Sequence, residues 1–297
     1  LGITGGTLDK LESIPGFNVN LSKEQALAQI EAIGVVMMGQ TADIAPADKK
    51  LYALRDVTAT VPSQPLIVAS IMSKKLAESL DHLILDVKFG SGAFMQTEAE
   101  AQSLGASMQS VGEMMGVQTQ VAYNPMNEPL GHAVGNALEV SEAIATLKGE
   151  GPDDLVRITI ELAMKLSGKP RQQLNDQLAN GNAYDKFLQI VEQQGGSPED
   201  IGRFSALHEA TVQKDLMSRA SGEILAIDAA AAGRVSLQLG AGRQRVDEGI
   251  DFSVGLSNIR KVGERINAGE ALLTVHAKDN PSAEAACENL HSAIRIE

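Results

Sequence analysis

The sequence predicts an α/β protein in which helices flank a mixed sheet, with a small helical lobe and a β-rich module at the C-terminal end. Three observations support this prediction. The nearly all-apolar segment His82–Val87 has strand length and is typical of a parallel sheet covered on both faces. It follows a stretch from Leu66 that contains neither Gly nor Pro, as a helix requires. Beyond Gly222, short β-like runs replace the helical periodicity.

The chain has 297 residues, more than one compact core usually needs, so several structural units are expected. The expected units are an α/β segment over 1–50 and a segment of the helical lobe over 51–80. A central α/β domain follows over 81–213, and a β-rich α+β module covers 222–297. The hydrophobic fraction of 43% is sufficient for packed cores in each part.

Composition also excludes some classes of function. The net charge of −13 argues against sequence-independent binding of nucleic acids, which requires a basic face. Cys287 is the single cysteine, so an intrachain disulfide is impossible and a reducing cytoplasm is expected. No apolar run approaches the length of a membrane span. An anionic substrate of so acidic a protein would require locally concentrated positive groups.

The first fifty residues predict two helices and one strand. A short helix is expected to end at Leu11, and Ser22 with Glu24 opens a second helix that runs to about Ala32. The apolar run Val35–Met38 before Gly39 predicts a buried strand. The segment Ile44–Asp48, which contains Pro46, is interpreted as a turn.

The next helix is expected to begin near Ser63, a possible N-cap, with Pro65 in its first turn. Its packing stripe comprises Ile67, Ile71 and Leu76. Strand His82–Val87 then leads into a Gly-rich loop over 88–95. After this loop we expect a helix over Glu98–Met115, a strand over Val117–Ala122 and a loop over Tyr123–Asn127. The remaining elements are helices: one that carries Glu139 and Glu142, and others over 152–168, 172–180, 184–194 and from Pro198 onward.

A linker is expected over Lys214–Ser221, where the composition changes. The β-like runs that follow are Gly222–Ile227, Arg234–Leu239, Phe252–Leu256 and Ala271–His276, and the closing helix is Pro281–Ser292. The turns around Val262–Ile266 and Ala268–Glu270 resemble those of hammerhead folds related to lipoyl domains. No lysine occupies a lipoyl-attachment context, so this hammerhead-like part is interpreted as structural.

One stretch carries the most informative polar groups. Ser70 and Lys74 are four residues apart and share a helix face, and Arg55 lies upstream on a segment that can return alongside. A guanidinium, a hydroxyl and an ammonium could then surround a small ligand rich in carbonyl oxygens. The alternative is an ordinary amphipathic helix with a solvated lysine, and spacing alone favours that alternative.

Several motifs resemble the thymidine and pyrimidine-nucleoside phosphorylases. They are Thr4–Gly16 (TGGTLDKLESIPG), Ala45–Asp56 (APADKKLYALRD), Asp86–Lys88 with Gly90–Met95 (GSGAFM), Gly135–Val140 (GNALEV) and Ile294–Ile296. The resemblance covers essentially the whole chain. It implies phosphorolysis of thymidine, uridine or deoxyuridine, in which phosphate replaces the base on the sugar.

The resemblance also implies roles for individual residues. Arg55, Ser70 and Lys74 would hold the pyrimidine base, with Tyr52 lining the pocket, and Arg55 and Lys74 would be the catalytic donors. Phe94 and Met95 would lie near the sugar and base, although hydrophobic packing is an equally good explanation of both. Thr7 would contact phosphate, which assigns 1–50 to the phosphate side.

A cation site is implied as well. The backbone carbonyls of Leu130 and Ala133 and the carboxylate of Glu142 would bind K⁺ or Ca²⁺, since oxygen ligands suit hard cations and not zinc. No organic cofactor is expected. The expected partners are a pyrimidine nucleoside, inorganic phosphate and a second copy of the chain in a homodimer, without nucleic acid or membrane.

The chain opens inside a family motif, with Leu1 and Gly2 matching and Ile3 in place of a histidine. The resemblance implies that the family's Lys-His-Ser phosphate and catalytic segment precedes Leu1. The 297-residue chain alone is therefore expected to be inactive, an N-terminally truncated piece of a longer enzyme. The alternatives are an inert fragment with a base-binding half-site, or a related phosphoribosyltransferase that binds pyrophosphate through Mg²⁺. A purely structural role ranks last.

Overall fold

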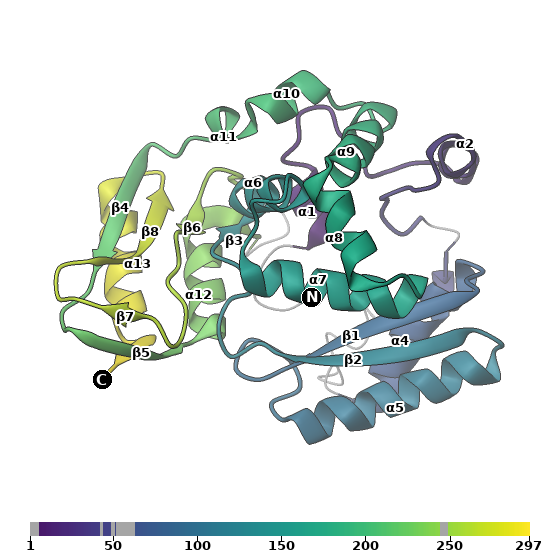
Figure 1. Ribbon diagram of the computed structural model, residues 1–297, viewed down its shortest axis with the longest axis horizontal. Helices are drawn as coiled ribbons and strands as arrows, with labels where there is room; N and C mark the ends of the chain where they lie inside the picture. The colour runs from purple at the N-terminus through teal and green to yellow at the C-terminus, as the bar shows by residue number, and fades with distance from the viewer. Residues whose placement is uncertain (1–5, 42–43, 49–50, 52–62, 244–248) are drawn as a thin grey trace.

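Figure 1 shows the computed structural model of the chain, which describes residues 6–41, 44–48, 51, 63–243 and 249–297. Three hydrophobic clusters organise these residues. The predicted α/β class is confirmed, because helices cover a parallel strand pair and antiparallel sheets form the C-terminal end.

The first cluster belongs to a β-α-β unit. Strands β1 (His82–Phe89) and β2 (Gln118–Pro125) pair in parallel, and helix α5 (Glu98–Met114) connects them. Helix α4 (Gln64–Ala77) packs beside α5 on the same side of the pair. Alternate strand residues point to opposite faces, so Val87 enters the core with side chains of both helices. The buried members are Val68, Met72, Val87, Ala101, Leu104 and Met108.

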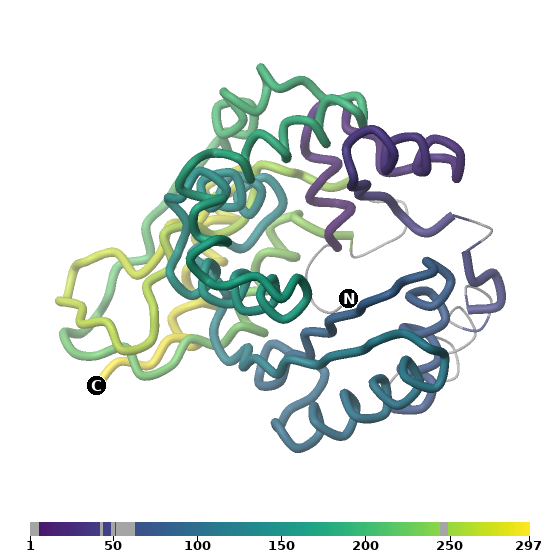
Figure 2. Tube along the Cα trace, turned by 45° about the vertical axis from the view of Figure 1, so that its right-hand side comes forward, coloured from purple at the N-terminus to yellow at the C-terminus, as the bar shows by residue number. Residues whose placement is uncertain are grey.

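The second cluster is helical. Helix α6 (Asn136–Leu147) packs against α1 (Thr7–Leu11), α9 (Asn182–Gln193) and α11 (Phe204–Leu207). Helices α2 (Lys23–Ile33) and α10 (Pro198–Gly202) also contact α9. Helix α7 (Asp153–Ser167) lies against β1 and β2, and α8 (Arg171–Ala179) links it to α9. Figures 1 and 2 both show α7 between the helical group and the strand pair.

The third cluster is the β-rich module, drawn in green and yellow in Figure 1. One antiparallel sheet has the order β3 (Val134–Gly135), β6 (Gly255–Ser257), β8 (Ala271–Ala277) and β4 (Val212–Met217). The other has the order β7 (Arg265–Ile266), β5 (Gly222–Ile227) and β9 (Ile294–Ile296). Helices α12 (Ala229–Ser236) and α13 (Asn280–His291) complete the module. Since β3 comes from the central part of the chain, the module and that part share a sheet.

Two sequence-based expectations are wrong. The run Val35–Met38 is not a strand: the buried Gln194 side chain accepts a hydrogen bond from the Met37 N–H and donates one to the Met37 carbonyl. The run Arg234–Leu239 is helical and continues into a π-helical turn, Leu237–Ala241. Asp228 caps this helix, and Val235 and Leu239, four residues apart, are both buried on one helix face.

Smaller differences concern element boundaries. The expected linker Lys214–Ser221 is strand β4 as far as Met217, where it pairs with β8. The expected loop at Tyr123 is still strand β2, which runs to Pro125. The run Phe252–Leu256 forms a strand only from Gly255. In each case pairing with a neighbouring strand, which local sequence does not encode, decides the boundary.

Among the described residues, no helix combines the length and the apolar character needed to span a lipid bilayer.

Candidate active site

The base-binding residues predicted on α4 are close together. Gln64 and Pro65 open the helix after Ser63, whose side chain makes no capping hydrogen bond. Val68 and Met72 are buried in the core with β1 and α5. Ser70 and Lys74 occupy a different helix face, and the Lys74 Nζ lies 2.9 Å from the Ser70 Oγ. The four-residue spacing places the two side chains on one helix face, as predicted, and the structure shows that they are in contact.

The Lys74 ammonium has a second partner that the sequence analysis did not identify. Its Nζ lies 2.6 Å from the Asp48 Oδ2, and the exposed fractions of the two side chains are 28% and 11%. Asp48 stands 26 residues before Lys74, within the Ala45–Asp56 motif. The position of Asp48 in this motif is the only feature of the sequence that pointed to a role for Asp48. Arg55 and Tyr52 lie outside the described residues.

The Gly-rich loop closes on itself at the carboxyl end of β1. Phe89 pairs with Met95, and the Gly90 N–H donates to the Met95 carbonyl over 2.9 Å. Gly90 has φ +110, and a side chain there would collide with Asn127, so this turn requires glycine. The Phe94 side chain is 57% exposed, whereas Met95 packs against the core of the strand pair. Of the two, Phe94 is available to a ligand.

A polar triad lies near the same edge of the strand pair. The Lys88 Nζ lies 2.6 Å from the Asp86 Oδ2, and the Asn124 Nδ2 donates to the Asp86 Oδ1 over 2.7 Å. Asp86 and Lys88 are two residues apart on β1, and therefore share a face opposite that of the buried Val87. Asp86–Lys88 belongs to a motif that resembles the phosphorylases, but the resemblance implied no role for these residues.

On the predicted phosphate side, Thr7 is exposed at the first position of α1. The Gly6 N–H donates to the Asp9 carboxylate over 3.0 Å, which fixes the start of this helix. Two ion pairs hold α1 in place: Asp9 with Arg243 at 2.9 Å and Lys10 with Glu139 at 2.7 Å. Residues 4 and 5 of the opening motif lie outside the described residues.

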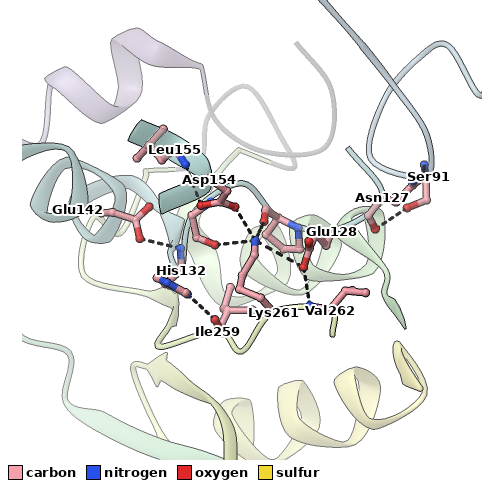
Figure 3. A network of polar contacts seen from close by, with 12 residues as sticks. Ser91, Asn127, Glu128, His132, Glu142, Asp154, Leu155, Ile259, Lys261 and Val262 are labelled. Atoms are coloured by element: carbon pink, nitrogen blue, oxygen red, sulfur yellow. Dashed lines mark hydrogen bonds and ion pairs between the residues drawn. The ribbon is translucent and has the colours of Figure 1, made fainter. Parts of the chain in front are cut away.

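Of the predicted cation ligands, Glu142 on α6 lies against the loop before β3, which carries Leu130 and Ala133. The His132 N–H donates to the Glu142 Oε1 over 2.7 Å, so the carboxylate lies against this loop (Figure 3). Burial raises the pKa of the Glu142 carboxyl above its usual value, although the His132 hydrogen bond acts in the opposite direction. A half-buried carboxylate of this kind fits a hard cation, which would compensate its charge.

Backbone oxygens would have to supply the remaining ligands. In the described part of the chain, no three His, Cys, Asp or Glu side chains are grouped so that they could hold a metal ion. A site at Glu142 therefore depends on carbonyls such as those of Leu130 and Ala133, as the resemblance implies. This donor set suits K⁺ or Ca²⁺ and not a transition metal.

Two sequence models of known families match the chain. A sequence model described as "Glycosyl transferase family, a/b domain" matches residues 1–184. A second, described as "Pyrimidine nucleoside phosphorylase C-terminal domain", matches residues 224–297. The first match contains the strand pair, and the second contains most of the β-rich module.

Individual relatives give the same result. The chain is 42% identical to a pyrimidine-nucleoside phosphorylase of Staphylococcus haemolyticus and to one of Bacillus subtilis, over its whole length and 70% of each relative. It is 44% identical to one of Staphylococcus epidermidis, over 93% of this chain and 66% of that protein. The chain therefore belongs to the pyrimidine nucleoside phosphorylase family of glycosyl transferases.

Proposed function

We propose that this chain takes part in the phosphorolysis of pyrimidine nucleosides and that α4 holds the base. The observation that carries this proposal is the contact of the Lys74 ammonium with Ser70 on one side and Asp48 on the other. It presents a fixed cation beside a buried hydroxyl, within the part of the chain that matches the glycosyl transferase domain.

The chemistry requires such a cation. A phosphate oxygen forms a bond to C1′ as the bond between C1′ and N1 of the base breaks, and the electron pair leaves with the base. Negative charge then spreads onto the carbonyl oxygens of the pyrimidine, so a donor aimed at one of them stabilises the transition state more than the substrate. Lys74 would supply this donor, and Arg55 a second one.

Ser70 would fix the orientation of the base. Its hydroxyl accepts a hydrogen bond from Lys74, which leaves its own O–H free to donate to a ligand. The side chain is only 7% exposed, and in this low-dielectric environment each polar contact is stronger than in water. Phe94 and Met95 would contribute apolar contacts, of which the exposed Phe94 ring is the more accessible.

Phosphate would be bound from the other side, with the Thr7 hydroxyl as one donor. α1 packs with α6, whereas α4 packs with α5 and β1, so the two predicted subsites belong to different hydrophobic clusters. A nucleoside and phosphate bound together would bridge these clusters. The ion pairs of Asp9 and Lys10 would keep the phosphate side rigid during the reaction.

A K⁺ or Ca²⁺ ion is proposed at Leu130, Ala133 and Glu142, with a structural role. It would neutralise the Glu142 carboxylate and hold the loop that precedes β3. We further propose that the working form is a homodimer and that the protein is cytoplasmic. Light scattering of the purified protein tests the dimer, since a mass equal to that of one chain would contradict it.

The function is tested by phosphate-dependent release of uracil or thymine from its nucleoside, with protein produced from the complete gene. Lys74→Ala and Arg55→Ala should each lower kcat by about 10²–10³-fold, the usual effect of losing one transition-state donor. Lys75→Ala is a matched control, because Lys75 is on the same helix but pairs with Glu78 in an exposed ion pair. Undiminished release by the Lys74 and Arg55 variants would refute the site. Mg²⁺-dependent consumption of phosphoribosyl pyrophosphate, with release of pyrophosphate, would indicate the phosphoribosyltransferase alternative.

A further inference from the structure

The ammonium of Lys261 lies inside a cage of oxygen atoms (Figure 3). Its Nζ lies 2.5 Å from the Pro129 carbonyl oxygen, 3.2 Å from that of Gly131, 2.9 Å from the Asp154 Oδ2 and 3.5 Å from the Glu128 Oε2. The Lys261 side chain is 15% exposed. Two carbonyls and two carboxylates around one positive charge resemble the ligand set of a bound alkali cation.

This cage joins two parts of the chain. Lys261 belongs to the β-rich module, more than a hundred residues from the loop 128–133 that it contacts. Neighbouring bonds reinforce the contact: the Ile259 N–H donates to the His132 carbonyl, and the Val262 N–H donates to the Glu128 carboxylate. Segment 259–262 therefore lies along loop 128–133 and fixes its backbone.

The hydrogen bonds of this loop select particular carbonyls. Those of Pro129, Gly131 and His132 all accept from segment 259–262. Among the hydrogen bonds of the described residues, none is accepted by the carbonyl of Leu130 or of Ala133. Of loop 128–133, the carbonyl of Glu128 is the third that accepts none of these hydrogen bonds, so both oxygens that the proposed cation needs remain available. Glu142 accepts from the His132 N–H of the same loop.

The charges around the loop also favour a bound cation. Glu128, Asp154 and Glu142 contribute three carboxylates, against the single ammonium of Lys261. Burial alone would raise the pKa of Asp154, but Lys261 and the N–H groups of Gly131 and Leu155 lower it below its usual value. Lys261 is therefore paired with Asp154, whereas the half-buried Glu142 accepts the His132 N–H and forms none of the ion pairs of the described residues, so a bound cation would balance its carboxylate.

We propose that Lys261 is a positioning residue that locks loop 128–133 against the β-rich module and so presents the Leu130 and Ala133 carbonyls, with Glu142, to a K⁺ or Ca²⁺ ion. This inference rests on the cation site of the proposed function. Lys261 does not contact the ion; it acts through the backbone of the loop. Cation affinity should consequently depend on a residue of the β-rich module.

The test compares Lys261→Met, which keeps the length of the side chain and removes its charge, with the exposed Lys278→Met as a control. Tm is measured against increasing KCl and, separately, CaCl₂, with choline chloride to match ionic strength. Hydrogen exchange of amides 128–133 is measured in parallel. We expect Lys261→Met to raise the KCl concentration at half-maximal Tm shift at least fivefold and to accelerate exchange about tenfold, while the KM for uridine stays unchanged.

The outcomes separate the two proposals. In Lys261→Met, the half-maximal KCl concentration and the exchange rate of the loop could both stay within twofold of the wild-type values. That result would overturn the role of Lys261 but not the cation site. A wild-type Tm that responds to neither KCl nor CaCl₂ beyond the choline control would overturn the cation site, and this role with it. If Lys261→Met does not fold, Glu128→Gln removes one carboxylate of the cage but keeps an acceptor for the Val262 N–H, and a smaller shift in the same direction is expected.

Discussion

The Lys74 Nζ lies 2.6 Å from the Asp48 Oδ2, and this pair joins helix α4 to the segment before it. The Asp48 carboxylate is more buried than the Lys74 ammonium. The surrounding protein therefore fixes the carboxylate, and the carboxylate fixes the ammonium. The ammonium then also reaches the Ser70 hydroxyl. Asp48 thus fixes the position of the cation to which we assign stabilisation of the departing base.

Replacement of Asp48 by Asn should therefore impair catalysis without unfolding the protein. Without its charge, residue 48 no longer holds Lys74 in one position, and kcat/KM for uridine should fall about tenfold, or about 1.4 kcal/mol. The exposed Glu31→Gln on α2 removes an acidic charge elsewhere and should leave kcat/KM unchanged. Equal activity of Asp48→Asn and wild type would show that Lys74 needs no such support.

Replacement of Glu142 by Gln should abolish the response to K⁺ but not lower stability in its absence. Because the folded pKa of Glu142 is raised, its contribution to stability is complete below the unfolded pKa and is lost as the pH rises through the folded pKa. At pH 7.5 without K⁺, Gln avoids the buried charge and should raise Tm by about 2 °C. The measurement is a thermal melt with and without KCl, and a lower Tm without K⁺ would contradict the argument.

The same linkage predicts how pH affects the cation. Protons and cations compete for the Glu142 carboxylate, so the Tm increase caused by KCl should be larger at pH 8 than at pH 5. A Tm increase that is independent of pH in the wild-type protein would place the cation elsewhere.

Replacement of Gly131 by Ala should disturb the cation site selectively. Gly131 has φ +72, and an added Cβ would collide with the Glu142 carboxylate. The left-handed conformation alone costs roughly 1–2 kcal/mol with a side chain. Gly168→Ala is the matched control, since Gly168 has φ +66 and nothing lies near its Cβ position. Both variants should lose stability, but only Gly131→Ala should lose the KCl response.

Replacement of Asp154 by Asn should lower stability at neutral pH but not in acid. The folded pKa of Asp154 is lowered, so its stabilising effect is present above the unfolded pKa and is lost as the pH falls through the folded pKa. The variant should lose about 1 kcal/mol at pH 7. Urea unfolding at pH 7 and at pH 3 measures both values, and an equal loss at both would contradict the assigned interaction with Lys261.

Sequence was sufficient wherever the determining contacts are local. Ser22 and Gln25 form the capping hydrogen bonds of α2, and Pro65 stands in the first turn of α4. The contact of Ser70 with Lys74 follows from one turn of helix. Helices α7 to α9 and strand β5 agree with their predicted ranges within two residues at each end.

The failures share one physical cause. Arg234–Leu239 was predicted as a β-like run, but burial of Val235 and Leu239 on one face, after the Asp228 cap, made it helical. Val35–Met38 was apolar enough for a strand, but the Met37 N–H forms a hydrogen bond with the side chain of Gln194 instead. These two residues are 157 positions apart in the sequence. Partners so distant in sequence are decided only when the chain folds.

The sequence by itself determined the family, the α/β class, and the pair of side chains that one helical turn brings together on α4. Only the tertiary structure decided that Asp48 holds Lys74 and that Lys261 locks the loop before β3. The physical reason is that side-chain direction within a helix is set by its period, whereas side-chain contacts across 26 or 130 residues depend on how separate elements pack.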